Sequence, residues 1–247
     1  MRIRFRDAIV WRYAFVAISK IIEEATLSFS PNGLKLRAMD PSAVALIDLA
    51  IPVESFTEFD IPGEVNIGLN MEEFAKVLKR ARKGDELVLE IGERKISVIF
   101  EGKGIRRFTI PSIETTLQEI PEISFEVAFR GKILPKVFKD VVRELEPISD
   151  VIEFHVPGDG DKLIIRASSE IGNAELELST SSGSLLECEI LGEASSKYTL
   201  DYLIDISTAS QVSEFLLMEF GNETPIRLVY ELPNGGKLEF YVAPRTD

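Results

Sequence analysis

The sequence runs twice through one order of elements: a helix, several strands, a second helix and further strands. Apolar periodicity predicts helices at about 8–24, 71–82, 134–146 and 201–209. The runs between them alternate apolar and polar residues and end at turns such as Asn32-Gly33, which is typical of β-hairpins. Because most strands are joined by tight turns, the sheets are expected to be antiparallel. The expected fold class is α+β, with two similar domains of antiparallel sheets and two helices each.

The repeat predicts an N-terminal domain at 1–112, an interdomain connector at 113–124 and a C-terminal domain at 125–247. The connector segment IETTLQEIPEI carries acids and a proline but no periodicity. It is either a plain linker or, through Leu117, Ile120 and Pro121, an apolar edge offered to a partner.

Composition allows hydrophobic cores, since 45% of the 247 residues are hydrophobic. A single cysteine, Cys188, permits no intramolecular disulfide and no thiolate-rich metal site. The N-terminal MRIRFRDAIVW has no apolar stretch typical of a signal peptide, and no apolar run is long enough to span a membrane. We therefore expect a cytoplasmic protein with no membrane partner.

The net charge of −13 is unevenly distributed. Residues 1–124 hold 17 basic and 19 acidic residues, a net charge of −2, whereas residues 125–247 hold 11 and 22, a net charge of −11. A uniformly acidic surface would repel nucleic acid, so the placement of the basic residues decides whether DNA can bind.

Basic residues recur at helical spacing in two equivalent predicted helices. One stripe contains Lys76, Lys79, Arg80 and Lys83, and the other contains Lys132, Lys136, Lys139 and Arg143, beside an apolar face of Leu134, Phe138, Val141 and Leu145. Each stripe alone can be a solvated surface. Both together, in an acidic protein, favour a surface that attracts a polyanion without reading bases. The first helix adds a mixed stripe with Arg12 and Lys20, whereas the fourth carries Asp201 and Asp205.

Catalytic motifs are missing from the sequence. The single histidine, His155, lies in a predicted strand, where a structural role is the simpler interpretation than a base or metal ligand. No G-x-S-x-G motif, P-loop or Cys/His pair occurs. We expect no enzyme, no metal and no cofactor, although a metal-dependent enzyme with converging carboxylates stays as a remote alternative.

Five segments carry a resemblance to a known family: LKLRAMDPSAVALIDLAIP, GLNMEEFAKVLKRARKGD, EIPEISF, SEIGNAELELS and the C-terminal LEFYVAPR. Together they resemble the archaeal type of the proliferating cell nuclear antigen family, the DNA polymerase sliding clamps of archaea and eukaryotes. The resemblance covers the whole chain.

This resemblance implies a pseudo-six-fold ring of three two-domain subunits, with helices around a central hole and sheets outside. The implied function is a processivity factor in DNA replication and repair, associated with the nucleoid, that encircles duplex DNA without sequence specificity. By resemblance the DNA-facing residues are Arg12, Lys76, Lys79, Arg80 and Arg143; the basic stripes add Lys20, Lys83, Lys136 and Lys139. A clamp-like scaffold that binds proteins but not DNA is the alternative, supported by the acidic fourth helix.

The resemblance also implies a front-face apolar pocket for short hydrophobic motifs of DNA polymerase, flap endonuclease and ligase, and a clamp loader as a further partner. Its expected residues are Met39, Ala43, Leu46, Ile120, Pro121, Phe125, Pro225, Tyr241, Val242, Ala243 and Pro244. The exposed AMDPSA turn would leave room for such a motif, although a plain turn begun by Asp-Pro is the simpler interpretation.

Ring closure in the family pairs edge strands of neighbouring subunits, here expected at Ile105–Pro111 and Ala174–Thr180. The interface residues are Ile105, Arg106, Arg107, Phe108 and Ile110 on one strand, and Ala174, Glu175, Leu176, Glu177 and Leu178 on the other. Opposed charges on the two strands would select partner and register. Both a homotrimer and a heterotrimer with paralogous clamp subunits stay open.

Overall fold

The computed structural model describes residues 1–115, 120–158 and 160–246. These residues form two compact units. The first unit contains Met1–Asp40, Ile47–Ile120 and Glu231–Leu238, and the second contains Pro41–Leu46, Pro121–Tyr230 and Glu239–Asp247. The predicted domain and connector boundaries stay predictions, and Leu117 of the connector lies outside the described residues.

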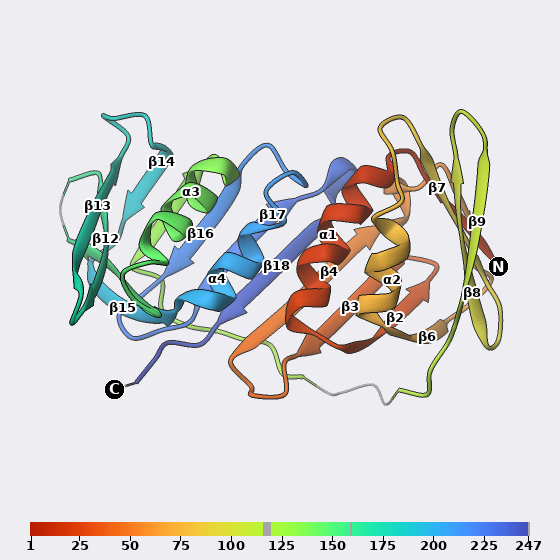
Figure 1. The fold of residues 1–247 in the computed structure, drawn as a ribbon, viewed down its shortest axis with the longest axis horizontal. Coiled ribbons are helices and arrows are strands. Elements are labelled where there is room, and N and C mark those ends of the chain that lie inside the picture. The colour runs from red at the N-terminus through yellow and green to blue at the C-terminus, as the bar shows by residue number, and fades with distance from the viewer. Residues whose placement is uncertain (116–119, 159, 247) are drawn as a thin grey trace. The chain divides into compact units, whose positions relative to one another are not determined.

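The elements follow the order that the sequence predicts (Figure 1). Up to residue 111 they are β1 (Arg2–Phe5), α1 (Ala8–Ile21), β2 (Glu24–Ser30), β3 (Gly33–Met39), β4 (Ala45–Pro52), η1 (Val53–Ser55), β5 (Glu58–Asp60), β6 (Val65–Asn70), α2 (Met71–Leu78), β7 (Glu86–Ile91), β8 (Lys95–Glu101) and β9 (Ile105–Pro111). After it come β10 (Phe129–Ile133), α3 (Pro135–Leu145), β11 (Val151–Pro157), β12 (Lys162–Ser169), β13 (Gly172–Ser179), β14 (Leu185–Ile190), β15 (Glu193–Thr199), α4 (Leu200–Ser207), β16 (Leu216–Phe220), β17 (Ile226–Glu231), η2 (Pro233–Gly235) and β18 (Lys237–Val242).

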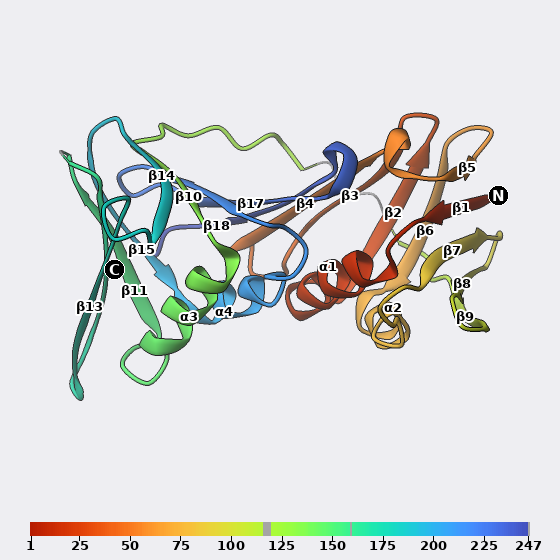
Figure 2. The same ribbon diagram turned by 90° about the horizontal axis from the view of Figure 1, so that it is seen from above.

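In the first unit, β5, β1, β7, β8 and β9 form a five-stranded antiparallel sheet in that order. Strand β2 pairs antiparallel with both β3 and β6 in a second sheet. Figures 1 and 2 show α1 and α2 side by side on one face of this second sheet. Sheet and helices thus form the two layers that bury the core of this unit.

An aromatic cluster between α1 and α2 holds this helix pair together. The rings of Trp11 and Phe15 are stacked with centroids 5.2 Å apart, and Phe74 of α2 meets Phe15 edge-on at 4.9 Å. All three side chains are almost fully buried. Such pairs add about 0.5–1.5 kcal/mol to the gain from burial.

The second unit repeats this plan. Strands β14, β10, β16 and β17 run side by side and antiparallel, and α3 and α4 cover one face of them (Figures 1 and 2). Strands β13, β12, β11 and β15 form a separate four-stranded antiparallel sheet. Over the described residues, the predicted α+β class with two helices in each unit is therefore confirmed. None of the described helices is long and apolar enough to cross a membrane.

Two predicted helix ends are wrong. Helix α1 stops at Ile21 rather than residue 24, because Glu24 already pairs with Asn70 as the first residue of β2. Helix α2 stops at Leu78 rather than residue 82. Leu134, predicted in the apolar face of α3, is instead the residue before the helix and is 43% exposed, while Pro135 occupies the first turn as expected.

Candidate nucleic-acid and protein interfaces

The sequence predicts that the basic residues around α2 share one helix face, but in the structure they do not. Lys76 lies in the helix, Lys79 caps its C-terminus, and Arg80 and Lys83 follow in a turn. Here the backbone N–H groups of Arg80 and Ala81 bond three residues back, to Val77 and Leu78, so the chain tightens out of the α-helix. All four basic side chains are exposed. The predicted single helical stripe is therefore wrong, because only Lys76 lies within the helix and the other basic residues lie at its end and in the following turn.

This basic turn is anchored by Asp85, which is 4% exposed. The Asp85 carboxylate accepts a hydrogen bond from the Arg82 backbone N–H at 2.6 Å and forms an ion pair with Arg106 of β9. Arg106 also donates to the Arg80 carbonyl at 2.7 Å, and Arg12 donates to the Ala81 carbonyl at 3.3 Å. Among the many acidic residues, nothing in the sequence singles out Asp85 for this role.

Acidic side chains next to the basic ones reduce the net positive charge of α2. Lys76 lies 2.7 Å from Glu72 one turn earlier, and the hydrogen bond from Lys76 lowers the pKa of the Glu72 carboxyl. Both side chains are more than half exposed, so the pair contributes little to stability. Asn70 caps the helix by accepting from the Glu73 N–H at 3.0 Å, and the acids of the first turn suit the helix dipole.

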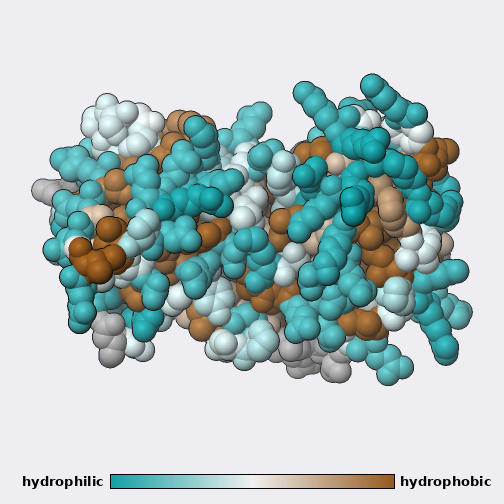
Figure 3. All heavy atoms as spheres, viewed as in Figure 1, coloured by the Kyte–Doolittle hydropathy of each residue, from teal (hydrophilic) through white to brown (hydrophobic). Residues whose placement is uncertain are grey.

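Helix α3 presents Lys136, Lys139 and Arg143 at i, i+3 and i+7, which places them on one face. Lys136 and Arg143 are exposed and Lys139 is partly exposed; Figure 3 shows hydrophilic residues over this helix. Lys132, counted with this stripe in the sequence, lies in β10 instead. Its ammonium is 3.3 Å from Glu187 and 3.8 Å from the ring of Phe215.

The two remaining helices contribute less basic charge. Lys20 is exposed in the last turn of α1, and Arg12 is half-buried with its guanidinium 5.4 Å from the ring of Tyr13. Helix α4 carries Asp201 in its first turn, exposed, and Asp205 farther on, partly exposed. The acidic character predicted for the fourth helix is thus at its surface.

The segment between β3 and β4 is exposed at Pro41, Ser42 and Ala43. Ala43 has φ +55°, a left-handed conformation that costs an alanine about 1–2 kcal/mol. The Val44 carbonyl accepts a hydrogen bond from the Ala243 N–H at 2.8 Å, so this loop and the C-terminal segment are neighbours in the second unit.

Two predicted partner-binding residues are buried. Leu46 is 2% exposed and Val242 is 0% exposed, because inward positions of β4 and β18 fill the core rather than the surface. The other predicted residues keep some exposed surface; they are Met39, Ala43, Ile120, Pro121, Phe125, Pro225, Tyr241, Ala243 and Pro244. The Tyr241 hydroxyl donates to Glu239 at 3.0 Å, and burial raises the pKa of Tyr241 to about 12.

Both predicted interface strands lie at the end of a sheet. Strand β9 is the last strand of the five-stranded order, and β13 ends the four-stranded order. Ile105 is 74% exposed and Phe108 is partly exposed, while Ile110 and Leu178 are buried. On β13, the partly exposed Ala174 and Leu176 alternate with the exposed Glu175 and Glu177.

The four predicted interface charges already have partners in their own chain. Arg106 pairs with Asp85, and Arg107 lies 2.5 Å from Glu90. Glu175 lies 2.8 Å from Arg166, and Glu177 lies 3.0 Å from Lys162. Opposed charges on the two strands would therefore have to exchange these intrachain partners before they could select a neighbour.

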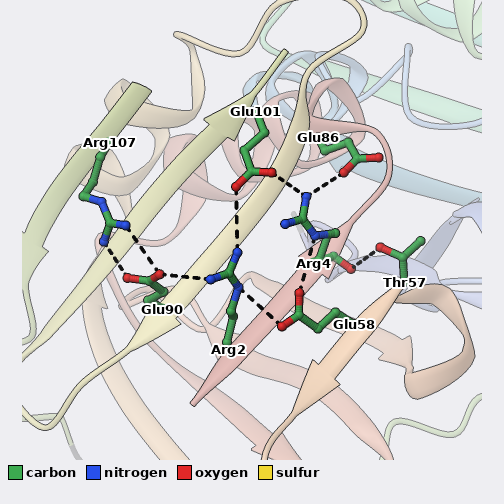
Figure 4. A network of polar contacts seen from close by, with 8 residues as sticks. All are labelled: Arg2, Arg4, Thr57, Glu58, Glu86, Glu90, Glu101 and Arg107. Atoms are coloured by element: carbon green, nitrogen blue, oxygen red, sulfur yellow. Dashed lines mark hydrogen bonds and ion pairs between the residues drawn. The ribbon is translucent and has the colours of Figure 1, made fainter. Parts of the chain in front are cut away.

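Arg107 belongs to a network that crosses all strands of the five-stranded sheet (Figure 4). At its centre Arg4 lies 2.6 Å from Glu101 and 2.7 Å from Glu86, and these hydrogen bonds raise the pKa of Arg4 and lower that of Glu101. Arg2 continues the network to Glu90, which Arg107 also contacts. The network therefore links β9 by ion pairs to the other strands of its sheet.

The described residues contain no group of three or more His, Cys, Asp or Glu side chains placed to hold a metal ion. His155 is partly exposed on β11, opposite Ile164 and Ser195.

Comparisons with known proteins agree over the full chain. The family model of the proliferating cell nuclear antigen N-terminal domain matches residues 1–120, and that of the C-terminal domain matches residues 119–245. DNA polymerase sliding clamp 3 of Sulfurisphaera tokodaii is 39% identical over all of both chains. DNA polymerase sliding clamp 3 of Aeropyrum pernix is 38% identical over all of this chain and 98% of its own. A solved PCNA2–PCNA3 complex from Sulfolobus tokodaii matches with a TM-score of 0.92 and 39% identity, over all of both chains.

Proposed function

This chain belongs to the proliferating cell nuclear antigen family, and from that membership we propose that it acts as a DNA sliding clamp, a ring subunit that keeps replication and repair enzymes on duplex DNA. The observation that carries the proposal is the exposed basic surface of each unit. Lys76, Lys79, Arg80 and Lys83 gather at α2, and Lys136, Lys139 and Arg143 share a face of α3, in a chain whose net charge is −13.

Exposed lysine and arginine side chains suit a contact that must move along DNA. They bind phosphates by releasing counterions, a term that does not depend on sequence and therefore does not hold the protein at one site. The acids elsewhere in the chain repel the duplex from other surfaces. In this function the protein performs no catalysis: it raises the residence time of the enzymes that do.

We propose that β9 and β13 join neighbouring subunits of a three-membered ring. Their terminal positions in the two sheets support this, since each leaves one side for a further strand. The similar solved structure is a complex of two different clamp proteins, which supports a heterotrimer with paralogous subunits. The solution mass of the purified chain distinguishes a heterotrimer from a homotrimer. A trimer of this chain alone that stays intact on dilution would establish a homotrimer instead.

Partner enzymes are proposed to dock where the exposed loop around Ala43 meets the C-terminal segment. The Ala243–Val44 hydrogen bond and the partly exposed side chains of Tyr241 and Pro244 support this choice. DNA polymerase, flap endonuclease and ligase would bind there through short hydrophobic motifs, and a clamp loader would open the ring. Such a protein works at the nucleoid.

The experiment compares retention on closed circular and linear DNA. The chain is loaded with its paralogous subunits and a loader, and its retention is measured over a range of salt concentrations. Substitution of Lys136, Lys139 and Arg143 by alanine should reduce the salt slope by up to about 0.9 for each phosphate that the protein no longer neutralises. A control removes three exposed lysines on strands, Lys35, Lys95 and Lys237, and should leave the slope unchanged.

The alternative of a clamp-like scaffold without DNA binding, suggested by the exposed Asp201 of α4, is not favoured, because the similar proteins are DNA polymerase sliding clamps. Equal loss from circular and linear DNA, with partner peptides still bound, would establish the scaffold and refute the clamp.

A further inference from the structure

The four-stranded sheet of the second unit carries a row of charges on one face. Lys197 of β15 lies opposite Glu153 of β11, Glu153 lies opposite Arg166 of β12, and Arg166 lies opposite Glu175 of β13. Arg166 is 3.9 Å from Glu153 and 2.8 Å from Glu175. The row therefore alternates in sign across all four strands and nearly balances itself.

The C-terminal segment adds a fifth charge to this row. The backbone N–H of Arg245 donates to the Lys197 carbonyl at 2.8 Å, which places Arg245 beside β15. A cavity of about 310 Å³ opens there, lined by Ser149, Val151, Glu153, Arg166, Ser168, Lys197 and Arg245. It thus has three cationic side chains and one carboxylate in its wall.

Glu153, the single carboxylate of this cavity, already has two polar neighbours. The Ser195 hydroxyl donates to Glu153 at 2.5 Å, on the side of β15, and Arg166 approaches from β12. An adjoining cavity of about 390 Å³ shares Glu153, Lys197 and Arg245 but adds Glu223, so its charges balance. The excess positive charge is therefore local to the first cavity.

The excess of positive charge at this cavity contrasts with the net negative charge of the C-terminal half, since residues 125–247 hold 22 acidic and 11 basic residues. An acidic segment that approaches this half is repelled over most of the surface and attracted at the cavity. The hydroxyls of Ser149 and Ser168 in its wall are further donors for a carboxylate oxygen.

We propose that this cavity is a subsite for an aspartate or glutamate side chain of a partner protein, held by Lys197 and Arg245. Extended nucleic acid fits less well, because Glu175, Glu223 and Asp150 lie around the cavity and would repel the phosphates next to the one that is bound. The site uses β12, β11, β15 and the C-terminal segment, and none of its lining residues belongs to β13. It goes beyond the clamp function, since it needs neither DNA nor a ring.

The test measures fluorescence anisotropy of a labelled peptide that carries a single aspartate among uncharged residues, with the purified chain, against the same peptide with asparagine in place of that aspartate. The aspartate peptide should bind more tightly, and added salt should weaken it. The double substitution Lys197→Ala with Arg245→Ala should weaken binding about tenfold, as expected for the loss of charge-assisted hydrogen bonds. The control, Lys162→Ala with Lys237→Ala, removes the same charge from exposed sites outside the cavity and should leave binding unchanged.

Thermal unfolding checks that both double variants are folded, and Arg245→Gln alone, on the exposed C-terminal segment, provides a second, milder variant. Equal affinity for the two peptides, no detectable binding of either, or unchanged binding by the cavity variants would each overturn the proposal. So would a single-stranded oligonucleotide that binds at the cavity more tightly than the aspartate peptide.

Discussion

Glu219 is the clearest test of the charge pairing inside the second unit. Its side chain, on β16, is 6% exposed and lies between two arginines, 2.6 Å from Arg130 and 2.6 Å from Arg227. Arg227 reaches on to Glu239 at 2.9 Å. Burial by itself would raise the pKa of Glu219, but the hydrogen bonds from the two arginines outweigh it and lower the pKa.

The substitution Glu219→Gln removes the charge and keeps the size. Breaking a fully buried pair costs about 3–5 kcal/mol, whereas an exposed pair is worth about 0–1 kcal/mol. Here the carboxylate is buried, but Arg130 is 46% and Arg227 is 26% exposed, so water screens the charges left behind. We therefore expect a loss of about 2 kcal/mol in the free energy of unfolding. The matched control is Glu189→Gln, which removes a carboxylate 3.0 Å from the same Arg130 but 54% exposed, and should cost less than about 0.5 kcal/mol.

Urea unfolding followed by far-ultraviolet circular dichroism, at one fixed protein concentration, measures both variants, because urea is uncharged and does not screen ion pairs. Because the folded-state pKa of Glu219 is depressed, its contribution is fully present above the ordinary pKa of 4.5 and is lost as pH falls through the folded-state value. The gap between the parent chain and Glu219→Gln should therefore be constant near neutral pH and shrink in acid. Equal losses for the two substitutions, or a gap that does not change with pH, would refute this reasoning.

Four other substitutions test single features of the structure by thermal unfolding. Ala43→Gly should raise the free energy of unfolding by about 0.5–1 kcal/mol, because glycine adopts φ +55° without strain; a loss would contradict the conformation. Gly33→Ala should cost more than about 2 kcal/mol, since its φ is +128° and an added Cβ would lie 2.1 Å from the Ile51 carbonyl oxygen; a neutral result would be incompatible with that contact. Leu46→Asp should cost more than about 3 kcal/mol because it buries a charge, whereas the partly exposed Met39→Asp should cost less than about 1 kcal/mol; similar losses would contradict the difference in burial.

The helices are predictable from sequence because their apolar faces recur at helical spacing, but their ends are decided elsewhere. In the segment after α2, Ala81 extends the apolar spacing, and lysine and arginine are good helix formers. The chain nevertheless turns, because Asp85 accepts the Arg82 N–H and Arg106 holds the Arg80 carbonyl. The Arg106 contact joins residues 26 positions apart in the sequence, and no local pattern contains it.

For the partner-binding residues, too, the sequence predicts one part of the answer and not the other. Resemblance suggests which segments bind a partner but not which side of each strand faces outward. Leu46 and Val242 point inward, while Ala43 and Tyr241 keep exposed surface. Because successive residues of a strand alternate between faces, a list drawn from contiguous segments includes both buried and exposed positions. A partner-binding test should therefore change Met39 rather than Leu46.

Arg106 links the two surfaces that the proposed function needs. It lies on β9, the proposed joining strand, yet its guanidinium binds the buried Asp85 and the Arg80 carbonyl of the basic turn. It therefore supports the basic turn more than it offers a charge to a neighbour. Arg107 differs, because it is 53% exposed and its partner Glu90 also contacts Arg2, so Arg107 can leave Glu90 without stranding a buried charge. If charge selects the neighbouring subunit at β9, Arg107 is the residue that makes the selective contact. Arg106 keeps the basic turn in place whichever subunit joins.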